Sequence, residues 1–247
     1  MDTKSPLAAA NGPPPANLLL AALPAEVFSR IAPALDVVPL KLKEILHPVG
    51  EPIRHVYFPA GGFCSIVTVL ADGTMVEVAT IGREGALGVS AHGDGGVARA
   101  ATMVQGAADI CYRMTGDRFR DEMRRHDAFY NLVTRFADAL VGFVMQSTAC
   151  NAIHSVEQRL ARWLLLAHDR MGRDDFPLTQ EFAAMMLGAS RPTVTVVAGT
   201  LQKAGLITYH RGHVTIVDRE HLEEASCECY RAVDALLKDV FRAAPQA

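Results

Sequence analysis

The spacing of hydrophobic residues changes part-way along this chain. Across residues 38–114, hydrophobic and polar residues alternate in short runs that end at glycine-rich turns, and Asp72-Gly73 separates two of these runs as in a β-hairpin. Many short strands joined by glycine turns predict a jelly-roll-like β-domain. The spacing then becomes helical and predicts helices at residues 117–126, 127–152 and 156–171, besides two short ones before the strands, at 18–23 and 25–35.

The helix predicted at residues 127–152 carries a seven-residue repeat of large side chains. Such a repeat suits pairing with an identical helix, so we predict a homodimer held by this seam. A helix packed only on its own β-domain is the alternative that the spacing leaves open. The predicted interface residues are Phe129, Val133, Phe136, Leu140, Phe143, Ser147 and Cys150.

Residues 178–203 predict two short helices joined by a glycine turn. Thr179 and Ser190 are suited to cap the starts of these helices, and Gly188 can adopt the positive φ that ends the first one. Pro192 fits the first turn of the second helix, where a missing N–H costs nothing. Two helices joined in this way are typical of a helix-turn-helix. A helical hairpin that serves only for packing is the alternative.

The residues that follow predict a β-hairpin beside the two helices. Residues 206–209 and 214–217 alternate like strands, and Arg211-Gly212 can form the tight turn between them. A hairpin directly after a helix-turn-helix is the wing of a winged helix. No Asp or Glu occurs at residues 182–217, which contain three Arg or Lys residues. This local absence of negative charge suits a surface that faces phosphates.

Composition and charge limit the classes of protein to which this chain can belong. A chain of 247 residues that is 50% hydrophobic can bury a sizeable core and fits two domains. The net charge of −3 means that any surface for nucleic acid must be local. Five cysteines, an odd number without a framework spacing, predict reduced thiols and a cytoplasmic protein. The longest hydrophobic run, residues 139–153, is too short to span a membrane and contains polar residues, so no membrane partner is expected.

A β-roll, a long helix and a winged helix-turn-helix, in this order, resemble the cyclic-AMP receptor protein/FNR family of bacterial transcription regulators. The most specific carriers of the resemblance are Tyr57-Phe58-Pro59, residues 82–88 and residues 178–207. The resemblance implies an α+β fold with a sensor β-roll at 17–126, a dimerisation helix at 127–152 and a winged helix-turn-helix domain at 153–247. Residues 1–16, which are rich in Pro, Ala and Asn, predict a disordered tail before it. It also implies a homodimer that binds double-stranded DNA, and it allows RNA polymerase as a further partner.

Matching the family's recognition helix residue by residue implies a changed target sequence. Arg191 keeps the first of the family's base-reading positions and is suited to bidentate contact with guanine, whereas Pro192 and Val196 replace the other two. These losses leave open a ligand- or partner-binding dimer with little specific DNA affinity. The predicted DNA-binding residues, at the helix starts and on the wing, are Thr179, Gln180, Ser190, Arg191, Pro192, Thr193, Thr195, Lys203, His210, Arg211 and His213.

The resemblance also places an effector pocket in the β-roll. Ala86 stands where the cyclic-AMP pocket has a ribose-binding glutamate, and Ala100 stands where it has a phosphate-binding serine. We therefore expect that cyclic AMP is not the physiological ligand. Binding of another, unidentified small-molecule effector remains an open alternative. The predicted pocket residues are Gly85, Ala86, Leu87, Gly88, Arg99 and Ala100.

No cofactor, metal site or catalytic site is predicted. Cys227 and Cys229 lie two residues apart on a predicted helix and would point to different faces, so we interpret them as structural. Residues 93–98 match the dinucleotide fingerprint GxGxxA, yet no buried strand precedes them and no helix follows. Residues 88–92 lack the last glycine of a nucleophile elbow. We therefore do not expect an enzyme.

Overall fold

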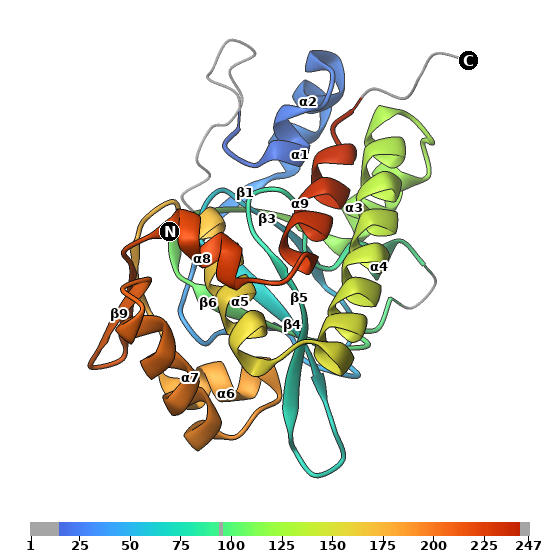
Figure 1. Cartoon of the computed structure of the whole chain (residues 1–247). Coiled ribbons are helices and arrows are strands. Elements are labelled where there is room, and N and C mark those ends of the chain that lie inside the picture. The colour runs from blue at the N-terminus through green and yellow to red at the C-terminus, as the bar shows by residue number, and fades with distance from the viewer. Residues whose placement is uncertain (1–14, 94–95, 243–247) are drawn as a thin grey trace.

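The computed structural model describes residues 15–93 and 96–242 of the chain (Figure 1). Residues 1–14 of the predicted tail lie outside the described residues. Asn17 is buried, and its side chain accepts a hydrogen bond from Leu20 N at 3.1 Å and donates to Pro59 O and Gly85 O at 2.9 Å. It therefore caps the first helix and fastens it to the strands. The first elements are α1 (Leu18–Ala21), α2 (Ala25–Ile31) and the 3₁₀ turn η1 (Ala32–Ala34).

Two antiparallel sheets form the predicted β-domain, which we call the β-roll (residues 36–115). One sheet has the strand order β1-β7-β3 and the other has the order β2-β6-β4-β5. The β4–β5 hairpin turns at Gly73, whose φ of 83° is the left-handed conformation that the Asp72-Gly73 pair predicted. The strands are β1 (Asp36–Leu40), β2 (Ile45–His47), β3 (His55–Pro59), β4 (Phe63–Val69), β5 (Met75–Ile81), β6 (Ala101–Gly106) and β7 (Ala108–Thr115), with the 3₁₀ turn η2 (Val89–His92) between β5 and β6.

Three helices follow the β-roll: α3 (Gly116–Met123), α4 (Ala128–Ile153) and α5 (Val156–Met171). Asp127 starts α4 by accepting a hydrogen bond from Phe129 N at 2.9 Å. Ser155 and Gln158 form a capping box at the start of α5, and Gly172, with φ of 64°, ends it. The predicted helices are confirmed, and α5 has the predicted bounds.

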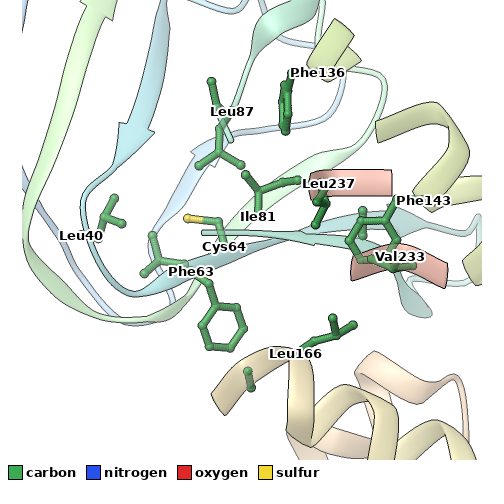
Figure 2. Close-up of a cluster of buried hydrophobic side chains, with 14 of the residues drawn as sticks. Leu40, Phe63, Cys64, Ile81, Leu87, Phe136, Phe143, Leu166, Val233 and Leu237 are labelled. Atoms are coloured by element: carbon green, nitrogen blue, oxygen red, sulfur yellow. The ribbon is translucent and has the colours of Figure 1, made fainter. Parts of the chain in front are cut away.

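The seven-residue seam of α4 faces the interior of the same chain. Six of its seven predicted members are buried, and only Leu140 is half-buried. The Cβ that an alanine would add at Gly85 would lie 2.4 Å from the Phe136 ring, and Phe143 points toward Val233 and Leu237 of α9 (Figure 2). The seam is thus the face by which α4 packs on β5 and α9. This corrects the prediction that Phe129, Val133, Phe136, Phe143, Ser147 and Cys150 meet a second copy; for the half-buried Leu140 it stays a prediction.

Helix α4 is also long and hydrophobic enough, by length and composition alone, to cross a membrane. An 18-residue window within it reaches a mean hydropathy of 1.2, which the run at residues 139–153 did not reveal. A core helix passes the same test, and α4 buries one face on its own sheet. One such helix is weak grounds for a membrane span.

The remaining elements, which we call the C-terminal region (residues 155–242), contain α5 and the predicted winged helix-turn-helix. The wing forms a sheet of order β8-β10-β9, whose first strand the sequence did not predict. Two terminal helices follow the wing, of which the sequence predicted only the one that carries Cys229, and Figure 1 shows α9 beside α4. The elements are β8 (Asp175–Pro177), α6 (Gln180–Leu187), α7 (Arg191–Lys203), β9 (Ile207–His210), β10 (His213–Ile216), α8 (Arg219–Ala225) and α9 (Cys229–Asp239).

The C-terminal region packs directly on the β4–β5 side of the β-roll. Phe63 of β4 and Trp163 of α5 meet edge to face, with ring centroids 6.0 Å apart, and Figure 2 shows Leu166 of α5 facing the same ring. Arg170 of α5 forms a buried ion pair with Glu84, N to O 2.8 Å. Hydrophobic and charged contacts together therefore fix the helix-turn-helix relative to the β-roll.

Candidate nucleic-acid interface

The helix-turn-helix is built by local caps at the positions that the sequence predicted. Thr179 Oγ1 accepts from Phe182 N at 3.2 Å at the start of α6. Gly188 ends that helix with φ of 56°, and Ser190 Oγ accepts from Thr193 N at 3.3 Å at the start of α7. These caps satisfy amides that the helix itself leaves unpaired. The glycine turn therefore sets α7 across α6 without strain.

The face of α7 that points away from the core is exposed from its first residue. Val194, Ala198 and Leu201 are its buried residues, so the side chains on the opposite face remain accessible. Thr195 Oγ1 donates to Gln180 Oε1 at 2.7 Å and so joins the starts of the two helices. Of the predicted DNA-binding residues, Gln180 is half-buried and the rest are exposed: Thr179, Ser190, Arg191, Pro192, Thr193, Thr195, Lys203, His210, Arg211 and His213.

The wing is held beside the helix-turn-helix by backbone and side-chain contacts. Arg211 and Gly212 have φ of 48° and 81°, as the tight turn of a two-residue hairpin requires. Leu178 N donates to Gly212 O at 2.8 Å, and the hydroxyl of Tyr209 donates to Leu178 O. Burial raises the pKa of Tyr209 to about 12, so this hydroxyl keeps its proton at neutral pH. The tip of the wing therefore lies next to the start of α6.

The wing is less free of negative charge than the sequence suggested. Strand β8 pairs with β10 and places Asp175 opposite Thr215. Asp175 accepts a hydrogen bond from Thr215 Oγ1 at 3.1 Å and lies 3.6 Å from His213 Nδ1. Residues 182–217 contain no acidic residue, but Asp175, from outside this range, thus lies beside the wing. His213 consequently faces a carboxylate, which makes it a weaker candidate for a phosphate contact than Arg211.

The predicted effector pocket is largely a packing site. Ala86 and Leu87 are buried in the core, and Gly85 lies against the Phe136 ring of α4. Gly88, with φ of 84°, covers the buried His47. Arg99 is exposed and Ala100 is half-buried. The side chains of Ala86 and Leu87 therefore pack in the core, and their assignment to an effector pocket stays a prediction.

The structure also brings together four residues that the sequence prediction had kept apart. Cys227 precedes α9, which begins at Cys229, so the two thiols can face the same point. The prediction that they point to different faces is wrong, because the helix starts later than the spacing suggested. Cys150 and His154, from the end of α4, complete a group whose ligand atoms all lie within 4.8 Å of one another. The sequence contains no spacing pattern from which this group could be recognised, because 77 positions separate Cys150 from Cys227.

Comparison with known proteins identifies the fold. Residues 158–225 match the family model described as the Crp-like helix-turn-helix domain. A transcriptional regulator assigned to the crp/fnr family, from Eubacterium rectale ATCC 33656, is 18% identical, with a TM-score of 0.65 over 85% of this chain and 98% of that one. The C-terminal region carries a Crp-like helix-turn-helix domain, and the chain has the Crp/Fnr fold. The resemblance of the sequence is thereby confirmed.

Other solved structures with the Crp/Fnr fold are similarly distant in sequence. A transcriptional regulator of the CRP family from Thermus thermophilus, TTHB099, is 22% identical, with a TM-score of 0.62 over 76% of this chain and 95% of that one. CLP, the c-di-GMP responsive global regulator of Xanthomonas campestris, is 14% identical, with a TM-score of 0.62 over 78% of this chain and 99% of that one. No curated protein matches the sequence.

Proposed function

We propose that the chain is a homodimeric, sequence-specific DNA-binding transcription regulator, and not an enzyme. The observation that carries the proposal is the exposed start of α7, in a region that matches the Crp-like helix-turn-helix domain. The first turn of a helix presents unpaired amides and the positive end of its dipole, which attract phosphate. Arg191 lies in that turn and takes part in none of the ion pairs among the described residues, so its guanidinium is free to reach a base.

A second copy of the chain would pair through the side of α4 opposite its buried seam. That side exposes Val141 and Met145, with exposed fractions of 54% and 66%, and Ile153 at 80%. Val141, Met145, Thr148 and Ala152 follow one another at intervals of four, three and four residues, which is the spacing of a coiled-coil stripe. Pairing there leaves Phe136 and Phe143 in the core of each protomer. Two α7 helices related by this axis would enter successive major grooves of a palindromic site.

The effector of the β-roll would not be cyclic AMP. A buried Ala86 replaces the carboxylate that the family resemblance requires for the ribose, and a charge-assisted hydrogen bond of this kind contributes about 1.5–3 kcal/mol. A small-molecule signal bound elsewhere in the β-roll would act through the packing of α4 and α5 on β5, because these contacts fix the helix-turn-helix. Calorimetry that detects tight, saturable cyclic-AMP binding would overturn this part of the proposal.

Selection of binding sites from random-sequence duplex DNA tests the proposed function. The expected outcome is enrichment of a palindrome with half-sites about one helical turn apart, bound by two copies of the chain. A selection that enriches no sequence, although the protein is folded and dimeric, would favour the alternative of a ligand- or partner-binding dimer with little specific DNA affinity. The exposed Val196, at 69%, stands where the family reads a base and is the residue that keeps this alternative open.

A further inference from the structure

Three cysteines and one histidine meet where α4 ends and the C-terminal region begins. Cys150 lies in the last turn of α4, and His154 is the residue that ends that helix. Cys227 and Cys229 come from the connection between α8 and α9 and from the first residue of α9. The three cysteines are buried and form a cluster separate from the main hydrophobic core. Two segments distant in sequence are thus joined by four side chains that all bind metals well.

The distances between these side chains match the coordination shell of a single ion. Cys150 Sγ lies 3.5 Å from Cys227 Sγ, and Cys229 Sγ lies 3.5 Å from His154 Nδ1. Tetrahedral zinc, with bonds of about 2.3 Å to sulfur and about 2.0 Å to nitrogen, separates two sulfurs by roughly 3.8 Å and a sulfur and a nitrogen by roughly 3.5 Å. All four ligand atoms lie within 4.8 Å of one another, so one ion fits with only small shifts of the side chains.

Glu228 and Gln146 contact the side chains of this group in the way that neighbouring residues contact the ligands of a bound metal. His154 Nε2 lies 3.3 Å from Glu228 Oε2, which leaves Nδ1 turned toward the sulfurs. A carboxylate on the far nitrogen of a metal-binding histidine is a common arrangement, because it fixes the ring and raises its basicity. Gln146 Nε2 donates to Cys229 Sγ at 3.0 Å, a contact that stabilises a thiolate. These contacts give Glu228 and Gln146 a role that packing alone does not explain.

Two arginines of α5 place positive charge beside the sulfurs. Arg162 of α5 is buried and stabilises negative charge on Cys150, and Arg159 interacts with charge on both Cys150 and Cys227. Three thiolates and one divalent ion carry a net charge of −1, which these guanidinium groups can balance. Binding of the divalent ion would release the thiol protons to solvent.

Other uses of the same residues fit less well. A disulfide between Cys150 and Cys227 would use two of the four side chains and leave His154 and Cys229 without a role. An iron–sulfur cluster contains several metal atoms and needs its ligands further apart than a 4.8 Å group allows. Four protein ligands that leave no open position are typical of a structural zinc site rather than a catalytic one.

We propose that Cys150, His154, Cys227 and Cys229 bind one Zn²⁺ in a closed tetrahedral site. The ion would fasten the start of α9 to the end of α4, next to the capping residue Ser155 that begins the C-terminal region. The ion would therefore stabilise the junction between α4 and the region that contains the helix-turn-helix. The proposal does not depend on the proposed DNA-binding function, because it rests only on this group and its neighbours.

The test is metal analysis of the full-length protein, followed by titration of the metal-free protein with Co²⁺. Elemental analysis should find one zinc per chain. Cobalt should give the sulfur-to-metal charge-transfer bands and the intense visible bands of a tetrahedral thiolate site, and Zn²⁺ should displace it. Cys227→Ala should lose both signals, whereas Cys111→Ala, which removes a buried cysteine of the β-roll, should retain them. Glu228→Gln should weaken zinc binding about 10- to 100-fold.

Several outcomes would overturn the proposal. Wild-type protein that binds no zinc and gives no cobalt bands would do so without reference to any variant, so misfolding of Cys227→Ala cannot hide a negative result. Iron in place of zinc, or a mass 2 Da below the reduced value with Cys150 linked to Cys227, would assign the group to other chemistry. Equal binding by Cys227→Ala and Cys111→Ala would place the metal elsewhere.

Discussion

Trp163 donates a hydrogen bond from its indole nitrogen to the buried Glu77 carboxylate, at 3.1 Å, and so joins the C-terminal region to the β-roll. Ser65 of the neighbouring strand donates to the same oxygen. Burial raises the pKa of Glu77 to about 7, although both hydrogen bonds oppose that change. A titratable group with a pKa near neutrality therefore lies between the β-roll and α5, the helix that leads into the helix-turn-helix.

The first prediction concerns the pH dependence of stability. Between pH 4.5, the ordinary pKa of a glutamate, and about 7, folded Glu77 holds a proton that the unfolded chain has released. The free energy of unfolding should therefore fall as pH rises through this window, by about 3 kcal/mol for this group. Glu77→Gln cannot ionise and should remove that part of the dependence in urea titrations at about pH 5 and pH 8. An unchanged pH dependence in the variant would show that Glu77 is already ionised in the folded state.

The second prediction concerns Gly85, where the backbone approaches the Phe136 ring. An alanine Cβ at this position would lie 2.4 Å from the ring, so Gly85→Ala should lower the free energy of unfolding by about 1–3 kcal/mol. Gly199→Ala is the matched control, because nothing lies within 4 Å of its Cβ and it is inside α7. That variant should be as stable as the wild type or more stable by about 0.5–1 kcal/mol. Equal loss of stability in both variants would mean that Gly85 is not a packing contact.

The third prediction concerns the surface through which two copies pair. Met145→Glu puts a charge in the centre of the exposed stripe of α4 and should convert the dimer into a monomer. Leu70→Glu changes an exposed hydrophobic residue at the tip of the β4–β5 hairpin, with an exposed fraction of 51%, and should leave the dimer intact. Light scattering after size-exclusion chromatography reports the mass of each. A Met145→Glu dimer as stable as the wild type would place the interface elsewhere.

The sequence predicted what local residue types determine. The ends of α6 and α7 followed from Thr179, Gly188 and Ser190, because caps and glycine turns act over three or four residues. The structure differs from the prediction where contacts between segments distant in the sequence determine the packing. The seam of α4 was correctly identified as a hydrophobic face, but its spacing does not distinguish packing on α9 of the same chain from packing on a second helix. Strand β8, at Asp175–Pro177, is too short for a periodic signal.

The candidate site shows the same division. The exposed residues on α7 and the wing could be named from their positions in a helix-turn-helix pattern. The carboxylate beside His213 could not, because it comes from a strand outside that pattern. The cluster of Cys150, His154, Cys227 and Cys229 exists only because α9 folds back along α4. The pair from α4 and the pair at the start of α9 are too far apart in the sequence to form a recognisable metal-binding motif.

The most direct measurement is the affinity of wild-type and Arg191→Ala protein for the selected site and for unrelated DNA, at one salt concentration. Arg191→Ala should lose about 1–3 kcal/mol, or roughly 5- to 150-fold, on the selected site and little on unrelated DNA. Arg124→Ala, which removes the exposed arginine directly after the end of α3, should bind both DNAs like the wild type. Equal losses on both DNAs, or no loss on the selected site, would contradict the account that α7 reads DNA through Arg191.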